Sequence, residues 1–65
     1  MTEESLRSLI RAKVARSARG ELTICLGCYG VSRLMFETAK EIAESITGEG
    51  TASWAKTGVL IIKKP

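Results

Sequence analysis

Two cysteines at C-x-x-C spacing are the residues with the clearest capacity for chemistry. Cys25 and Cys28 stand in the stretch ELTICLGCYG, which is typical of a strand running into a glycine turn. Thiols at this spacing can form a reversible disulfide, and a nearby helix N-terminus lowers a thiol pKa. Cys28 precedes the next expected helix by about three residues, so we expect the helix N-terminus to lower the pKa of Cys28. Three interpretations stay open: a redox pair, a metal site shared by two subunits, or a core Cys25 beside a turn Cys28.

The residues around the pair restrict its redox and metal chemistry. The only proline is Pro65, so the cis-proline of a thioredoxin-like protein has no counterpart opposite the cysteines. Tyr29 follows Cys28 where haem attachment requires histidine. A closed zinc site needs four ligands, so a zinc ion or iron–sulfur cluster would have to bridge two subunits.

Four residue types are absent from the chain: His, Asp, Asn and Gln. Their absence removes imidazole bases, Ser-His and Cys-His pairs, and histidine metal ligands. We therefore expect no enzyme activity and no cofactor. The lack of thermolabile amides favours a protein from a hot environment.

The glycine turn GCYGVS offers a second kind of site. Backbone N–H groups between a strand and a helix can face an anion such as phosphate, although no Walker lysine follows here. The alternative is a tight turn in which Gly30 or Ser32 caps the next helix. Tyr29 at the tip either stacks on a nucleic-acid base or lies on the surface.

Charge is segregated along the chain, which has a net charge of +3. Residues 1–20 carry five basic and two acidic groups, residues 21–50 two basic and five acidic, and residues 51–65 three basic and none acidic. If the first helix and the C-terminal hairpin share a side, their cations form a phosphate-binding surface. The alternative is a solvated basic face. Trp54 is either a core or interface residue or a base-stacking one.

The first expected helix occupies the segment before Gly20. Thr2 can cap it, and Glu3 and Glu4 suit the positive end of its dipole. Gly20 after Arg19 is a typical helix stop. The helix has one apolar stripe at helical spacing, formed by Leu6, Leu9, Ile10 and Val14.

The remaining elements are a strand over 21–26, a helix over 31–47 ended by Gly48, and a hairpin with strands over 51–55 and 59–63. Gly58 suits the left-handed position of a three-residue hairpin loop. The apolar arc of the second helix contains Val31, Leu34, Met35, Thr38, Ala39, Ile42 and Ile46. We predict an α+β fold, a small two-layer α-β-α-β-β domain with the helices packed on one face of a short sheet.

Chain length limits the size of the core. A chain of 65 residues is one domain, residues 1–65, and buries only about 60% of its unfolded surface. We therefore expect a homo-oligomer, most often a two-fold dimer. No apolar run could span a membrane and no signal peptide is visible, so we expect a cytoplasmic protein without membrane partners.

The stretch SARGELTICLGCYGVSRLMFETAKEIAE resembles Alba-type chromatin proteins. The likeness lies in ELTI (Glu21 to Ile24), VSR (Val31 to Arg33) and the closing hairpin, Thr51 to Lys64. The resemblance implies a fold shared with the C-terminal domain of translation initiation factor 3 and with the sulfur-carrier TusA group. It also implies that Tyr29, Arg33 and the AKTG turn beside Lys56 face nucleic acid. The family's first strand and lysine-rich loop have no counterpart here, and neither cysteine precedes proline as in the TusA group.

The preferred hypothesis is a basic protein that binds DNA or RNA through phosphate contacts without strong sequence preference. A cysteine redox or intersubunit metal protein and a protein-interaction or regulatory module are the alternatives. The sequence does not decide between DNA and RNA. The candidate nucleic-acid-binding residues are Arg7, Arg11, Arg16, Arg19, Tyr29, Arg33, Lys56, Lys63 and Lys64.

Overall fold

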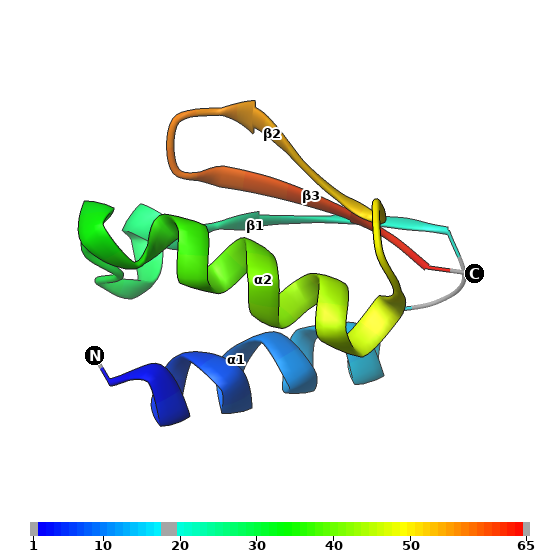
Figure 1. Cartoon of the computed structure of the whole chain (residues 1–65), viewed down its shortest axis with the longest axis horizontal. Coiled ribbons are helices and arrows are strands. Elements are labelled where there is room, and N and C mark those ends of the chain that lie inside the picture. The colour runs from blue at the N-terminus through cyan, green and yellow to red at the C-terminus, as the bar shows by residue number, and fades with distance from the viewer. Residues whose placement is uncertain (1, 18–19, 65) are drawn as a thin grey trace.

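Two helices lie on one face of a three-stranded sheet in the computed structural model, which describes residues 2–17 and 20–64 (Figure 1). This arrangement confirms the predicted α+β class, the order of the elements and the packing of the helices on one face. The elements, including two short 3₁₀ turns, are α1 (Glu3–Arg16), β1 (Glu21–Cys25), η1 (Leu26–Tyr29), η2 (Arg33–Met35), α2 (Phe36–Thr47), β2 (Ala52–Lys56) and β3 (Val59–Lys63).

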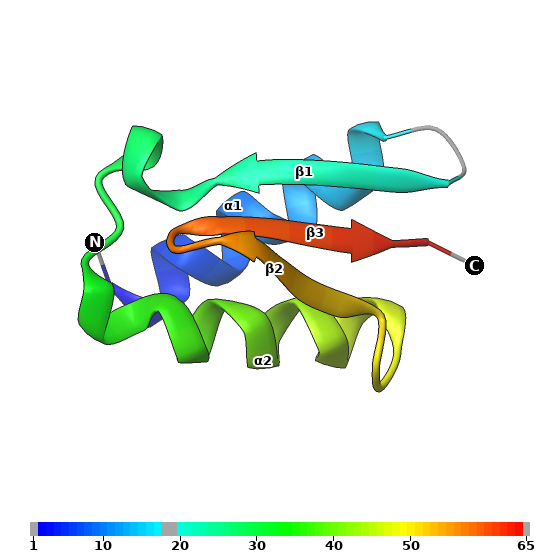
Figure 2. The same ribbon diagram turned by 90° about the horizontal axis from the view of Figure 1, so that it is seen from above.

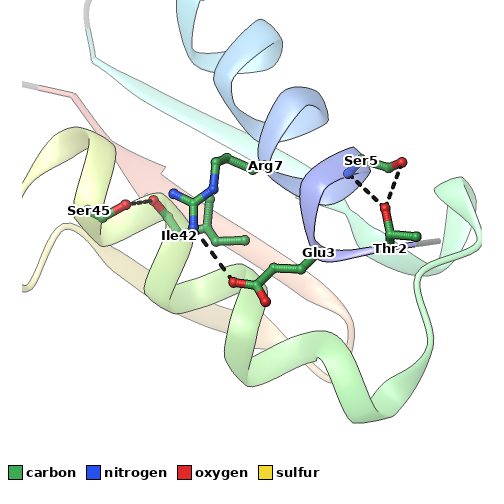
Figure 3. Close-up of polar contacts among 6 residues, drawn as sticks. All are labelled: Thr2, Glu3, Ser5, Arg7, Ile42 and Ser45. Carbon is green, nitrogen blue, oxygen red and sulfur yellow. Dashed lines mark hydrogen bonds and ion pairs between the residues drawn. The ribbon is translucent and has the colours of Figure 1, made fainter.

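Helix α1 begins as predicted and ends earlier than predicted. The Thr2 hydroxyl accepts a hydrogen bond from the Ser5 backbone N–H at 3.1 Å, which caps the first turn (Figure 3). The helix ends at Arg16, because Ser17 adopts an extended backbone. Arg19, at the expected end, lies outside the described residues. Leu6, Ile10 and Val14 form the buried stripe, and Leu9 is half-buried at its edge.

Helix α2 starts five residues later than the sequence pattern predicts. The segment before it forms η2, and a 3₁₀ turn has about three residues per turn against 3.6 in an α-helix. Val31 is buried and Met35 of η2 is half-buried against the core, so the predicted apolar contact continues before α2. Leu34, expected on the same apolar arc, is 94% exposed, which corrects the prediction. Ala39, Ile42 and Ala43 form the buried face, and Gly48 ends the helix with a positive φ of 117°.

The sheet is antiparallel with the strand order β1-β3-β2 (Figure 2). Alternate residues of each strand face the helices, so Ile24 of β1 pairs with Leu60 of β3 in the core. The register places Thr23, Ile61 and Ser53 in one row on the opposite face, which neither helix covers. A single core between one sheet face and two helices thus holds the domain together.

The β2–β3 hairpin differs from the prediction in its loop. Lys56 pairs with Val59, so two residues rather than three separate the strands, and the register shifts between Trp54 and Lys56. Gly58 has the expected left-handed φ of 82°. A Cβ atom at this position would lie 3.2 Å from the Phe36 ring, so the turn also needs glycine for close packing.

Candidate functional site

Several turns meet at one end of the molecule, which we call the turn end: η1, η2 and the β2–β3 turn at Thr57 and Gly58 (Figures 1 and 2). The Leu26 backbone N–H donates to the Gly58 carbonyl at 2.7 Å, and Gly58 packs against Phe36. These contacts fix the hairpin turn to the segment between β1 and α2. The turn end therefore has a defined geometry although little of it is regular structure.

Three of the predicted nucleic-acid-binding residues lie at the turn end. Tyr29 belongs to η1, Arg33 to η2, and Lys56 is the last residue of β2, beside the hairpin turn. All three side chains are exposed. The Lys13 ammonium lies 4.9 Å from the centre of the Tyr29 ring, so a further cation from α1 reaches this end. The turn end thus combines exposed cations with an exposed aromatic ring.

An open cleft of about 360 Å³ lies between the start of α2 and the β2–β3 hairpin. The rings of Phe36 and Trp54 stand with their centroids 5.9 Å apart at 44°. Trp54 packs against the core and also lines the cleft. Phe36 was not predicted from the sequence, because its role depends on the close approach of Gly58. The lining residues are Phe36, Glu37, Trp54, Lys56, Thr57 and Gly58.

The remaining predicted cations lie apart from the turn end. Arg7 forms an ion pair with Glu3 at 3.6 Å and lines a second hollow beside α2 (Figure 3). Arg11 and Arg16 are exposed along α1, and Lys63 is exposed at the opposite end of β3. Arg19 lies outside the described residues. The fold therefore distributes these cations over several surfaces rather than gathering them on one.

Lys64 has internal hydrogen-bond partners. Its ammonium donates to the carbonyls of Val14 at 2.8 Å and Ser17 at 2.7 Å, and its backbone N–H donates to the Gly20 carbonyl at 2.6 Å. The side chain is half-buried. Lys64 therefore supplies partners for the C-terminal carbonyls of α1, a role that the sequence did not predict.

The cysteine pair lies at the same end as Tyr29, Arg33 and Lys56. Cys25 is the last residue of β1, Cys28 lies in η1, and both thiols are free. The Cys28 thiol donates to Cys25 Sγ with the sulfurs 2.7 Å apart. Cys28 is exposed and Cys25 is half-buried, so solvent reaches the pair.

The environment separates the pKa values of the two thiols. Hydrogen bonds from the Cys28 side chain and backbone lower the pKa of Cys25, with smaller contributions from Lys56 and the Gly27 N–H, while burial opposes them. The hydrogen bond to Cys25 and the charge of Cys25 raise the pKa of Cys28. The sequence predicted the lowered pKa at Cys28. The prediction was wrong because α2 begins only at Phe36, and the contact with Cys25 raises the pKa of Cys28 instead.

Other features of the described chain limit the possible sites. Among residues 2–17 and 20–64, no three His, Cys, Asp or Glu side chains come together as a metal site. No helix in the same ranges is long and apolar enough to cross a membrane. In comparisons with known proteins, no family model, curated protein or solved structure matches the chain.

Proposed function

We propose that this protein binds nucleic acid at the turn end, with Arg33 and Lys56 contacting phosphates and Tyr29 stacking on a base. The observation that supports the proposal is that Lys56, distant in sequence, is exposed at the same end of the fold as Tyr29 and Arg33. Phosphate contacts supply affinity without sequence information, and stacking tolerates any base. The protein therefore binds DNA or RNA with little sequence preference.

The charge distribution around the turn end directs the approach of a polyanion. Helix α2 carries exposed or half-buried carboxylates at Glu37, Glu41 and Glu44, which repel phosphate along most of its length. The Arg33 guanidinium precedes this helix, and the Lys56 ammonium lies beyond its start, on the hairpin. A strand held by Lys56 lies at the edge of the Phe36–Trp54 cleft, which Lys56 lines together with the Glu37 carboxylate.

The test is fluorescence anisotropy with short labelled oligonucleotides, single-stranded and duplex, of both DNA and RNA. With two phosphate contacts, log affinity is expected to fall against log salt with a slope of about −1.4 on single strands and −1.8 on duplex DNA. Arg33→Ala and Lys56→Ala should each weaken binding and reduce the magnitude of the slope by about 0.7 on single strands and about 0.9 on duplex DNA. A salt-independent affinity, or no binding at low salt, would refute the proposal.

Arg11→Ala is the matched control, because it removes the same charge from an exposed position of α1, away from the turn end. We expect its slope to match that of the unmodified chain. An equal loss for Arg11→Ala and Arg33→Ala would mean that net charge alone governs binding, and the turn end would then be the wrong site.

We also propose that the chain forms a homodimer, because a 65-residue domain has a small core. Sedimentation equilibrium of the free protein tests this, with twice the chain mass expected. The same measurement with oligonucleotide separates self-association from assembly on nucleic acid. A monomer at high concentration in both samples would contradict the proposal.

A further inference from the structure

The two thiols at the turn end have the arrangement of a dithiol that can close into a disulfide. Their sulfurs are 2.7 Å apart, against about 2.05 Å in a disulfide bond. The main chain already makes the required turn, since Cys25 ends β1 and Cys28 lies in η1, which Gly30 closes with a left-handed φ of 75°. Bond formation therefore needs only a small displacement of the two side chains.

We propose that Cys25 and Cys28 form a reversible disulfide by thiol–disulfide exchange with low-molecular-weight disulfides. The proposal concerns a chemistry separate from nucleic-acid binding and does not depend on it. A one-chain metal site is less well supported, because the described residues bring no third His, Cys, Asp or Glu ligand to the pair. Exposure of Cys28 and half-burial of Cys25 leave both sulfurs within reach of a small reagent.

The hydrogen-bond pattern assigns different roles to the two sulfurs. Cys25 Sγ accepts from the Cys28 thiol, and backbone N–H groups of Cys28 and Gly27 favour its thiolate form. The hydrogen bond to Cys25 and the charge of Cys25 raise the pKa of Cys28, which favours its protonated form. Because the thiolate is the nucleophile in exchange, Cys25 attacks first and Cys28 resolves the intermediate.

The exchange proceeds in two balanced steps. The Cys25 thiolate attacks one sulfur of the small disulfide, forming a mixed disulfide and releasing one thiolate, which takes up a proton. Cys28 then loses its proton to solvent and attacks Cys25 Sγ, forming the internal bond and releasing the second small thiol. The protein dithiol gives up two electrons, and the small disulfide is reduced to two thiols.

A disulfide at this spacing closes a very short loop, so it contributes little to the stability of the fold. Its formation changes the chemistry of the turn end and leaves the core in place. We therefore expect the reduced and oxidised chains to unfold at similar denaturant concentrations. Similar stabilities of the two forms would distinguish a reactive pair from a structural disulfide, whose removal typically lowers the free energy of unfolding by about 2–5 kcal/mol.

The experiment equilibrates the full chain in buffers of reduced and oxidised glutathione. Acid quenching, alkylation with N-ethylmaleimide and intact mass measurement then count the free thiols. In oxidising buffer we expect the chain mass to fall by two hydrogens and no cysteine to be alkylated. In reducing buffer we expect both cysteines to be alkylated. Moving the oxidised chain to reducing buffer should restore both free thiols. A chain that stops at a glutathione adduct, or that stays reduced throughout, would overturn the proposal.

Single serine variants test the assigned roles. Cys28→Ser should accumulate glutathione on Cys25, because the resolving thiol is missing. Cys25→Ser should react with glutathione disulfide more slowly than Cys28→Ser at neutral pH, because Cys28 lacks the backbone N–H donors that favour the thiolate of Cys25. Circular dichroism checks that each variant is folded. Equal rates for the two variants would refute the assignment of Cys25 as the nucleophile.

Metal analysis of the protein purified under reducing conditions completes the test. The proposal predicts no bound zinc, iron or copper. One metal ion for each pair of chains, lost in both serine variants, would assign the cysteines to an intersubunit metal site and overturn the disulfide proposal.

Discussion

Replacing Lys64 by methionine removes an ammonium group that holds the C-terminal end of α1. The group donates to the carbonyls of Val14 at 2.8 Å and Ser17 at 2.7 Å. Carbonyls at a helix C-terminus lack partners within the helix and carry partial negative charge. Methionine retains an unbranched stem and loses both hydrogen bonds, so the substitution isolates the role of the ammonium.

The expected loss follows from opposing contributions. A hydrogen bond to a charged group contributes about 1.5–3 kcal/mol, and holding the lysine side chain costs up to about 2 kcal/mol of rotamer entropy. Two such bonds less this entropy give about 1–4 kcal/mol, and solvent screening at a half-buried position favours the lower part, so we expect a net loss of about 1–2 kcal/mol in the free energy of unfolding. In a domain of this size each kcal/mol corresponds to about 4–8 °C, so Tm should fall by about 4–16 °C.

Chemical and thermal unfolding followed by circular dichroism measure this change. Lys63→Met is the control, because the neighbouring side chain is exposed and should change stability by less than about 0.5 kcal/mol. Equal stabilities of the two variants would refute the capping role. A Lys64→Met chain of normal stability that binds nucleic acid less tightly would instead support the phosphate contact predicted from the sequence.

Substitutions at three further positions test separate parts of the fold. Gly58→Ala should lower the free energy of unfolding by about 1–3 kcal/mol in urea titrations, because φ is 82° and the new Cβ would lie 3.2 Å from Phe36. Leu34→Ser should change this free energy by less than about 0.5 kcal/mol, since the side chain is 94% exposed. A loss typical of a core residue would instead support the longer helix over 31–47 that the sequence predicts. Thr2→Ala should lower the free energy of unfolding by about 1 kcal/mol through loss of the cap, and Thr2→Ser should retain the cap.

The sequence predicted the elements of the fold wherever local pattern decides them. The stripe of Leu6, Ile10 and Val14 defines α1, and the second hairpin strand, Val59–Lys63, agrees with its predicted bounds. Gly48 ends α2 as expected. These features depend on helical or strand periodicity and on glycine stops, which are readable within a few residues.

Contacts between distant residues account for what the sequence did not predict. The bonds from Lys64 to Val14 and Ser17 span 50 and 47 positions, and no local pattern indicates them. The aromatic cleft likewise needs α2 and the hairpin to be brought together. In the candidate site, spacing predicted that Cys25 and Cys28 could interact. The direction of their pKa separation depends on η1, which forms where the sequence predicted a glycine turn.

Lys56 connects the two proposed chemistries. The register places it in one row with Val59 and Cys25 across the sheet, and its charge helps to lower the pKa of Cys25. Lys56→Met should therefore slow the first exchange step of Cys25, by about twofold for a unit charge two strands, or roughly 10 Å, away in water. Arg33→Met should weaken nucleic-acid binding and leave the exchange rate unchanged.

The same coupling predicts that bound nucleic acid slows exchange at Cys25. A phosphate paired with the Lys56 ammonium offsets its positive charge, so the pKa of Cys25 rises and the fraction of thiolate falls. The measurement compares exchange rates of the Cys28→Ser variant with and without saturating oligonucleotide at neutral pH. The same comparison in the Cys28→Ser, Lys56→Met double variant distinguishes the effect of charge from steric protection. If the oligonucleotide still slows exchange without Lys56, it does so by covering the Cys25 thiol. An oligonucleotide that binds with Lys56-dependent affinity and leaves the exchange rate unchanged would show that Lys56 does not couple the two sites.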